Sequence, residues 1–212
     1  MISDLSPLTS ALLEELTPYG RYGVQLDAEL ATHTSFRIGG PAAALLTIHQ
    51  LTHLEAALNT LHHTQTPFLL LGGGSNVLIS DTGIPNLVIL NQCRQIHWPA
   101  ESLEPVLVQA ETGASLAGFA RATIKRHLSG LAWAVSIPGT IGGAVVGNAG
   151  AHGGCIADNL QSIQLWESGQ TNHIPTYQLR FDYRHSRLKP LLAQPSHGPV
   201  VLSAAFLLQA DA

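Results

Sequence analysis

Residues 68–81, FLLLGGGSNVLISD, hold three consecutive glycines and a Ser-Asn pair between two apolar runs, each with the composition of a buried strand. A Walker phosphate-binding loop requires GxxxxGK[ST], and its lysine is missing here. A dinucleotide-binding fingerprint requires GxGxxG at the start of a helix, whereas Asn76 is followed by the strand-like run VLIS. Both standard nucleotide motifs are therefore excluded, and a strand-loop-strand arrangement is predicted.

The loop at residues 72–76 could bind an anion without a charged side chain. Glycine reaches positive φ at no steric cost, so residues 72–74 can turn several N–H groups toward one point. Ser75 and Asn76 add side-chain donors for the same ligand. The alternative is a tight glycine turn between two core strands. For this loop alone the turn is favoured, because glycines commonly punctuate strands.

A second glycine-rich stretch, IPGTIGGAVVGNAGAHGG at residues 137–154, changes that balance. The alternative interpretation is a linker, but the stretch is apolar and lacks the serine and charge content of solvated linkers. Its small side chains leave room for a flat ligand to lie against the backbone. Together with a glycine pair at residues 39–40, these surfaces predict one long ligand that carries a pyrophosphate and planar rings.

The composition is that of an ordinary globular protein. The 212 residues are 45% hydrophobic and 11% charged, so the chain can bury a core as one domain or two small ones. A net charge of -4 without a Lys/Arg cluster argues against nucleic acid as a partner. Eleven histidines are scattered without metal-ligand spacing, so no metal site is predicted.

Cysteine usage and the N-terminal sequence predict a cytoplasmic location. Cys93 and Cys155 lie far apart and outside any CxxC spacing, as expected for thiols in a reducing compartment. The start of the chain, MISDLSPLTSALLEEL, has neither a basic region nor an apolar run long enough for export or for spanning a membrane. No membrane partner is expected, and the sequence leaves the oligomeric state open.

Hydrophobic periodicity predicts an α+β fold. In the first part of the chain, helices over residues 7–16 and 52–65 flank a strand at 43–48, and a further strand runs into the glycine loop. The order strand, helix, strand predicts a small parallel βαβ unit. The second of these helices is predicted to bury Leu54, Ala57, Leu58 and Leu61 on one face.

The second part of the chain is predicted to differ from the first, with a boundary that divides the chain into residues 1–92 and 93–212. Strand-like runs at its two ends, PVLVQAE and VVLSAAFLLQ, and two more at SIQLWES and TNHIPTYQL, predict an antiparallel sheet with helices on one side. A helix over residues 115–128 is predicted to bury Leu116, Phe119, Ala120 and Ile124.

Four blocks of the chain carry a resemblance to a known family: THTSFRIGGPA, LLLGGGSNVLISD, SIPGTIGGAVVGNAGAHGG and FDYRHSRLK. In order and approximate spacing they resemble the UDP-N-acetylenolpyruvoylglucosamine reductase family of flavoenzymes, over roughly residues 32–212. The resemblance implies an FAD-binding fold of the vanillyl-alcohol-oxidase type, with non-covalent FAD between the βαβ subdomain and the antiparallel subdomain. It implies the following cofactor-binding residues: Arg37, Gly39, Gly40, Gly72, Gly73, Gly74, Ser75, Asn76, Pro138, Gly139, Thr140, Gly142, Gly143, Asn148, Ala149 and Gly150.

The resemblance also implies a reaction. The family reduces the enolpyruvyl ether of a nucleotide sugar with NADPH, in peptidoglycan precursor synthesis, and charge develops toward the pyruvyl carboxylate. A fixed cation stabilises such charge in a dry site, and a guanidinium pairs with a carboxylate in bidentate geometry. The matching block assigns this catalytic role to Arg184 and substrate binding to Tyr183. The alternative is a surface arginine beside Arg180 and Arg187.

The sequence departs from the family toward its end. The family carries a GSxFKNP-type segment with a proton-donating serine, and no stretch of this chain reads SxFKN. Ser186 and Ser203 lie outside any such block. Two alternatives follow, a reductase fragment without its substrate lobe or an FAD-binding module that acts without that lobe. A flavin oxidase of the same fold is disfavoured, because many such enzymes tether flavin through a histidine after a GG turn and Gly40 is followed by Pro41.

Overall fold

The computed structural model describes residues 8–100, 105–192 and 198–211. The chain forms two compact units, and each is described by itself. The first unit comprises Met1–Cys93, Glu167–Gln170 and Leu192–Pro199, and the second unit comprises Arg94–Trp166, Thr171–Leu191 and Val200–Ala212.

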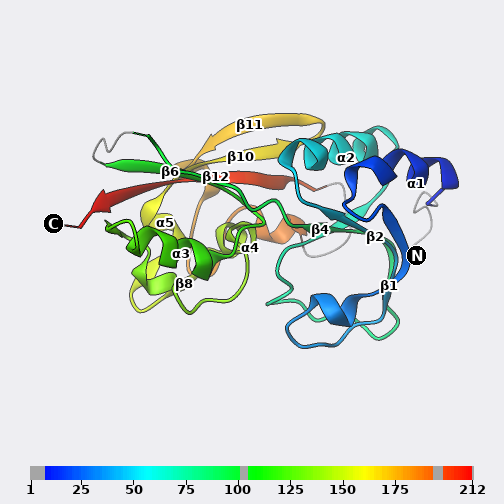
Figure 1. The fold of residues 1–212 in the computed structure, drawn as a ribbon, viewed down its shortest axis with the longest axis horizontal. Helices are drawn as coiled ribbons and strands as arrows, with labels where there is room; N and C mark the ends of the chain where they lie inside the picture. The colour runs from blue at the N-terminus through cyan, green and yellow to red at the C-terminus, as the bar shows by residue number, and fades with distance from the viewer. Residues whose placement is uncertain (1–7, 101–104, 193–197, 212) are drawn as a thin grey trace. The chain divides into compact units, whose positions relative to one another are not determined.

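The first unit contains a four-stranded sheet in the order β1-β2-β4-β3 (Figure 1). Strand β2 is parallel to β4 and β4 is parallel to β3, while α2 connects β2 to β3, so the predicted parallel βαβ unit is confirmed. Strand β1 adds an antiparallel edge that the sequence did not predict. The elements are α1 (Ser10–Leu16), β1 (Val24–Glu29), β2 (Pro41–Ile48), α2 (Leu51–His63), β3 (Phe68–Leu71) and β4 (Ile84–Asn91), with 3-10 turns at Thr17–Tyr19 and Leu30–His33.

Helix α2 buries the predicted apolar stripe against the first unit. Leu54, Ala57, Leu58 and Leu61 are all fully buried, at the i, i+3, i+4, i+7 spacing of one helical face. With 13 residues, α2 is the longest helix in the described part of the chain, and no helix there is long and apolar enough to cross a membrane.

The run VLIS at residues 77–80 is not a strand, and this prediction is wrong. Strands β3 and β4 are parallel, so the chain must return along the whole strand length between them, which a tight turn cannot do. Residues 72–83 form this crossover without a helix, in extended and turn conformations. Ile79 is buried in the first unit's core, whereas Leu78 is 74% exposed, so the apolar run is only half buried.

The second unit is built on an antiparallel sheet in the order β11-β10-β12-β6-β5, with β7 also paired to β12. Strand β12 is antiparallel to both β10 and β6, as predicted. Figure 1 shows α3, α4 and α5 on one side of these strands. The elements are β5 (Ile96–His97), β6 (Val106–Glu111), α3 (Leu116–Ile124), β7 (Leu128–Ser129), α4 (Ile141–Gly147), β8 (Gly150–Ala151), β9 (Gly154–Cys155), α5 (Ile156–Asn159), β10 (Leu160–Glu167), β11 (Gln170–Pro175) and β12 (Val200–Ala210), with 3-10 turns at Ala132–Ala134, Thr176–Leu179 and Lys189–Leu192.

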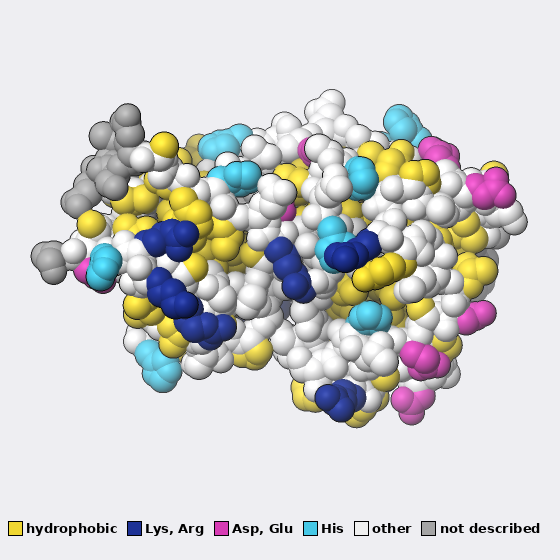
Figure 2. Space-filling model, in the orientation of Figure 1, with side chains coloured by type: hydrophobic (Ala, Val, Ile, Leu, Met, Phe, Trp, Pro, Cys, Tyr) yellow, Lys and Arg dark blue, Asp and Glu magenta, His cyan; other side chains and the backbone are white. Residues whose placement is uncertain are grey.

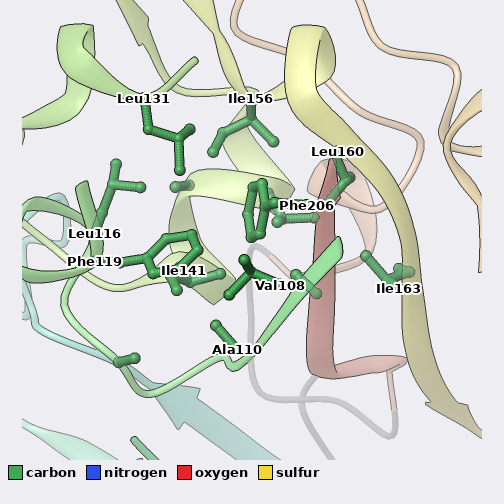
Figure 3. Close-up of a cluster of buried hydrophobic side chains, with 14 of the residues drawn as sticks. Val108, Ala110, Leu116, Phe119, Leu131, Ile141, Ile156, Leu160, Ile163 and Phe206 are labelled. Carbon is green, nitrogen blue, oxygen red and sulfur yellow. The ribbon is translucent and has the colours of Figure 1, made fainter. Parts of the chain in front are cut away.

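The core of the second unit gathers side chains from the sheet and from the helices that cover it (Figure 3). Phe119 of α3 and Phe206 of β12 are both fully buried, with ring centroids 5.2 Å apart. Ile141 of α4 lies in the same cluster. Burial of these large side chains fixes both helices on the sheet, because each contributes roughly 1.5–3 kcal/mol by leaving water.

Two helices differ in detail from the prediction. Helix α1 begins at Ser10 with the Thr9 hydroxyl accepting from Leu12 N–H at 3.2 Å; of the residues predicted before it, Pro7 lies outside the described ranges. In α3, Leu116, Phe119 and Ala120 are buried as predicted, but Ile124 is 43% exposed.

Thr123 takes the buried place in the last turn of α3, because it continues the i, i+3, i+4, i+7 series from Leu116. Its hydroxyl is satisfied by donating to Ala120 O at 2.8 Å. The exposed side of this helix end carries basic residues, and Figure 2 shows Lys and Arg side chains close together on the second unit. Arg126, just beyond α3, lies over the Trp98 ring with 4.0 Å between Cζ and the ring centroid.

Candidate functional site

The glycine loop of the first unit is held in place through Gly74. This residue has φ 60°, and a Cβ at its position would overlap the carbonyl of His33. Ser35 N–H donates to Gly74 O at 3.0 Å, so the segment 33–35 supports the loop from behind. Of the three glycines, Gly74 alone has positive φ, which corrects the expectation that all three would use that freedom.

The donors of this loop are available to a ligand. The N–H groups of residues 73–76 have no acceptor within the described residues, and the Ser75 and Asn76 side chains likewise make no hydrogen bond there. Successive N–H groups without protein acceptors, next to a hydroxyl and an amide, suit a phosphate or pyrophosphate. The loop therefore fits the anion-binding role predicted from its sequence.

The glycine pair before β2 has a backbone-packing role. Gly40 N–H donates to Ser80 O at 2.9 Å, and a Cβ on Gly40 would overlap the carbonyl of Asp81. Gly39 has φ 138°, and a Cβ there would lie 2.9 Å from Ile79 Cβ. Arg37, with φ 54° and an exposed side chain, belongs to the turn just before this pair. The first unit thus brings together two predicted cofactor-binding segments: Gly39 and Gly40 pack on the crossover, and loop 72–76 rests on the segment that precedes them.

The second glycine surface is a short helix, α4, which the sequence did not predict. Ile141, Ala144 and Val145 are buried in the second unit's core, and this packing outweighs the low helix propensity of glycine. Gly142 packs tightly, since a Cβ there would lie 2.9 Å from Thr112 Cβ. The opposite face differs, as shown by the two remaining glycines of the helix.

Gly143 and Gly147 stand one turn apart on α4 and face open space. A Cβ on Gly147 would meet nothing within 4 Å, and one on Gly143 would meet only Thr140 Oγ1 at 3.9 Å. Among the described residues of the second unit, no packing explains why these two positions lack side chains. Because this side of α4 has no side chains at these two positions, a planar group could lie close to the backbone. The helix therefore fits the ring-binding role predicted for this stretch.

The approach to α4 is pinned to the start of α3. Gly139, with φ 110°, accepts from Leu116 N–H at 3.1 Å, and Thr140 forms an isolated bridge with Ser115. The Thr140 side chain does not cap α4, and Pro138 is exposed. The Thr140 hydroxyl and the Pro138 ring are therefore both available to a ligand.

Asn148 ends α4 in the left-handed conformation, with φ 42°, and is 7% exposed. Its Nδ2 donates to Asp182 O at 3.0 Å, and its Oδ1 accepts from Ala157 N–H at 3.1 Å. Both ends of the amide are therefore bonded to protein, and its cofactor-binding role stays a prediction. Ala149 and Gly150 follow, with Ala149 N–H bonded to Ala144 O at 2.9 Å and Gly150 paired with Cys155.

Tyr183 and Arg184 form the tip of a tight turn. Asp182 N–H donates to His185 O at 3.1 Å and His185 N–H donates to Asp182 O at 3.0 Å, which closes the turn on both sides. Arg184 has φ 53°, and its carbonyl accepts from Lys189 Nζ at 2.7 Å. Tyr183 is 87% exposed and Arg184 is exposed as well. The guanidinium thus projects from a fixed backbone.

Sequence reasoning missed the residues that anchor this turn. Ser186 is fully buried and its hydroxyl donates to Val146 O of α4 at 2.6 Å, so it is structural, in line with its exclusion as a proton donor. Ser203 is also buried and accepts from Gln109 Nε2 at 2.9 Å. The bond between Asn148 and Asp182 joins residues 34 apart in the chain, and no local spacing pattern reveals it.

The cysteines form no disulfide in the described part of the chain; Cys93 is buried and Cys155 is half-buried. Partial burial raises the pKa of the Cys155 thiol, and the hydrogen bond and negative charge of Asp158 raise it further. Within the described ranges, no group of three or more His, Cys, Asp or Glu side chains could hold a metal ion.

Comparison with known proteins first defines the class. The family model described as FAD binding domain matches residues 41–171, and the chain belongs to this family. Its fold is the FAD-binding fold of the vanillyl-alcohol-oxidase type, as predicted. A solved structure of alkyldihydroxyacetonephosphate synthase shares the fold with a TM-score of 0.65 at 15% identity, covering 98% of this chain and 42% of that one.

Closer similarity is found to one enzyme. The chain is 42% identical over 188 residues to UDP-N-acetylenolpyruvoylglucosamine reductase of Synechococcus sp. (strain RCC307), covering 87% of this chain and 58% of that protein. The same-named enzyme of Acaryochloris marina is 40% identical, with coverage of 96% and 64%. The crystal structure of the Thermus caldophilus enzyme matches with a TM-score of 0.71 at 28% identity, covering 89% and 62%. The chain thus spans about three fifths of these relatives, and the resemblance predicted from its four blocks is confirmed.

Proposed function

We propose that this chain serves the reduction of UDP-N-acetylglucosamine enolpyruvate to UDP-N-acetylmuramate, with FAD bound non-covalently and NADPH as the reductant. The relatives named for this reaction support the substrate class. The two cysteines, which form no disulfide among the described residues, support a cytoplasmic location.

The observation that carries this proposal is the backbone fixation of Arg184. A reductase of an enolpyruvyl ether must stabilise negative charge that spreads toward the pyruvyl carboxylate, and a guanidinium does this best when it need not reorganise. The turn at residues 182–185 is closed by two hydrogen bonds and anchored on α4, yet its tip is exposed. A fixed backbone reduces the reorganisation that the guanidinium needs before it pairs with a carboxylate.

Different residues of the chain would bind the cofactor and the substrate. When bound, FAD supplies the two-electron redox chemistry. In the first unit, the N–H groups of residues 73–76, with Ser75 and Asn76, would hold its pyrophosphate. In the second unit, the open face formed by Gly143 and Gly147 would admit a planar group. Tyr183 and Arg184 would orient the substrate through its carboxylate.

Substrate binding to the FAD-loaded protein tests the proposal. The enolpyruvyl nucleotide sugar is titrated while the flavin absorption spectrum is recorded, for the native protein and for Arg184→Gln. Loss of one charge-assisted bidentate contact, worth about 1.5–3 kcal/mol, should weaken binding by roughly 10- to 100-fold. Arg187→Gln is the matched control, since Arg187 is an exposed arginine three residues away. Equal affinities for the native protein and both variants would contradict the role of Arg184.

A further inference from the structure

The turn that presents Arg184 is tied to the C-terminal end of α4 on both of its sides. Before the tip, Asp182 O accepts from Asn148 Nδ2 at 3.0 Å; after it, the Ser186 hydroxyl donates to Val146 O at 2.6 Å. We infer that Asn148 and Ser186 are positioning residues, which hold Arg184 in a fixed place relative to the glycine face of α4. The inference rests on the proposed function for the role of Arg184 alone.

Asn148 links three segments: α4, the turn at residues 182–185 and α5. Its side chain is 7% exposed and bonds the turn through Nδ2 and α5 through Oδ1, which accepts from Ala157 N–H at 3.1 Å. A buried amide with both ends satisfied has one orientation, because a flip would set donor against donor and carbonyl against acceptor. The Asp182 carbonyl is therefore held at a defined distance from the end of α4.

Ser186 completes the anchor on the other side. Besides donating to Val146 O, its oxygen accepts from Leu188 N–H at 3.3 Å, and the residue is fully buried. Leu179 and Leu188 are buried on either side of the turn. The base of the turn is thus rigid while Tyr183 and Arg184 reach solvent.

The hydrogen bonds of Asn148 and Ser186 matter because the glycine face and the Arg184 turn both depend on α4. Gly143 and Gly147 give α4 its open face, and Val146 and Asn148, from its last turn, hold the arginine turn. A displacement of about 1 Å of a reacting group can cost on the order of 10²-fold in rate. Among the described residues, Asn148 and Ser186 make no hydrogen bond to the side chain of Tyr183 or Arg184, so an effect that they have through this turn must pass through its backbone.

The chain offers substitutions that separate positioning from folding. Asn148→Gly keeps the left-handed backbone, which glycine tolerates, and removes both side-chain bonds. Asn148→Asp retains the acceptor for Ala157 N–H but sets a carboxylate against the Asp182 carbonyl. Ser186→Ala removes the second tie. Ser203→Ala is the matched control, because Ser203 is a buried serine of the second unit that hydrogen-bonds elsewhere.

Amide hydrogen exchange of the FAD-loaded protein tests the anchoring directly. Each lost hydrogen bond is worth about 1.4 kcal/mol, so Asn148→Gly, Asn148→Asp and Ser186→Ala should each raise exchange at the Asp182 and His185 amides about tenfold. The Ser203→Ala control should leave those amides at the native rate. Native exchange rates in both Asn148→Gly and Ser186→Ala would overturn the inference.

A double-mutant cycle on substrate affinity then tests whether Asn148 acts through Arg184. Asn148→Gly should weaken binding of the enolpyruvyl nucleotide sugar about tenfold when Arg184 is present and have little effect in the Arg184→Gln background. Additive penalties would overturn action through Arg184. If the native protein binds no such sugar, the proposed function falls, while the exchange result still decides whether the turn is anchored.

Discussion

Gly74 lies so close to His33 that a Cβ on this glycine would overlap the His33 carbonyl, and its φ of 60° is one that side chains disfavour. Gly74→Ala should therefore lower the free energy of unfolding by about 1–3 kcal/mol. Gly73, which is not at positive φ, should tolerate alanine with a smaller loss. Urea unfolding of the flavin-free proteins measures both. Equal losses would show that the support from His33 does not fix the loop.

Cys155 provides a pH-dependent signal. Because burial and Asp158 raise its thiol pKa, the folded chain holds this proton to higher pH than the unfolded chain, and stability should fall as pH rises through that range. Iodoacetamide should modify Cys155 more slowly than a simple thiol at neutral pH, and Asp158→Asn should speed the reaction by lowering the pKa. Cys93 is fully buried and should not react in the native protein. A rate unchanged by Asp158→Asn would contradict the assigned cause.

The flavin should be bound without a covalent bond. The glycine pair at residues 39–40 leads directly into Pro41 at the start of β2, so no histidine follows it as a tether. Acid precipitation should release all of the yellow chromophore into the supernatant. Flavin that stays on the protein pellet, with free FAD added to apoprotein as the control, would contradict the prediction.

Local patterns predicted much of this fold because they report local causes. The stripe of α2 follows from its side-chain period, and the strands of the second unit follow from apolar runs separated by Gly, Pro and Asn; both are present. Helix α4 was not predicted because glycine disfavours helices. Tertiary burial of Ile141 and Val145 stabilises it. The run at residues 77–80 was mistaken for a strand because apolar composition does not reveal that β3 and β4 are parallel.

The candidate site shows the same division. The glycine loops are visible in the sequence because their residue types carry the chemistry, whereas the Tyr-Arg pair is assigned by the family resemblance. The anchors are not, because the contacts of Asn148 and Ser186 join residues 34 and 40 positions apart in the chain. Only the folded structure shows which polar side chains form the hydrogen bonds that hold the Arg184 turn in place.

Turnover by this 212-residue chain should be incomplete. NADPH should bleach the bound flavin anaerobically. Return of the oxidised spectrum with the enolpyruvyl substrate should be slow, because the sequence has no SxFKN stretch to supply an acid, and general acid catalysis is worth about 10²- to 10⁴-fold. Stopped-flow absorbance measures both steps. Substrate-dependent recovery at ordinary turnover rates, about 1–10³ per second, would show that another residue donates the proton.

The central claim, that loop 72–76 binds the pyrophosphate of FAD, is tested most directly by calorimetric titration of the apoprotein. FAD should bind in equimolar amount, ADP should compete with it, and riboflavin, which lacks phosphate, should bind far more weakly. Ser75→Ala should weaken FAD binding by roughly 10- to 100-fold while leaving riboflavin binding unchanged, because a hydrogen bond to a charged group is worth about 1.5–3 kcal/mol. Equal affinity for riboflavin and FAD, or no binding of either, would contradict the account.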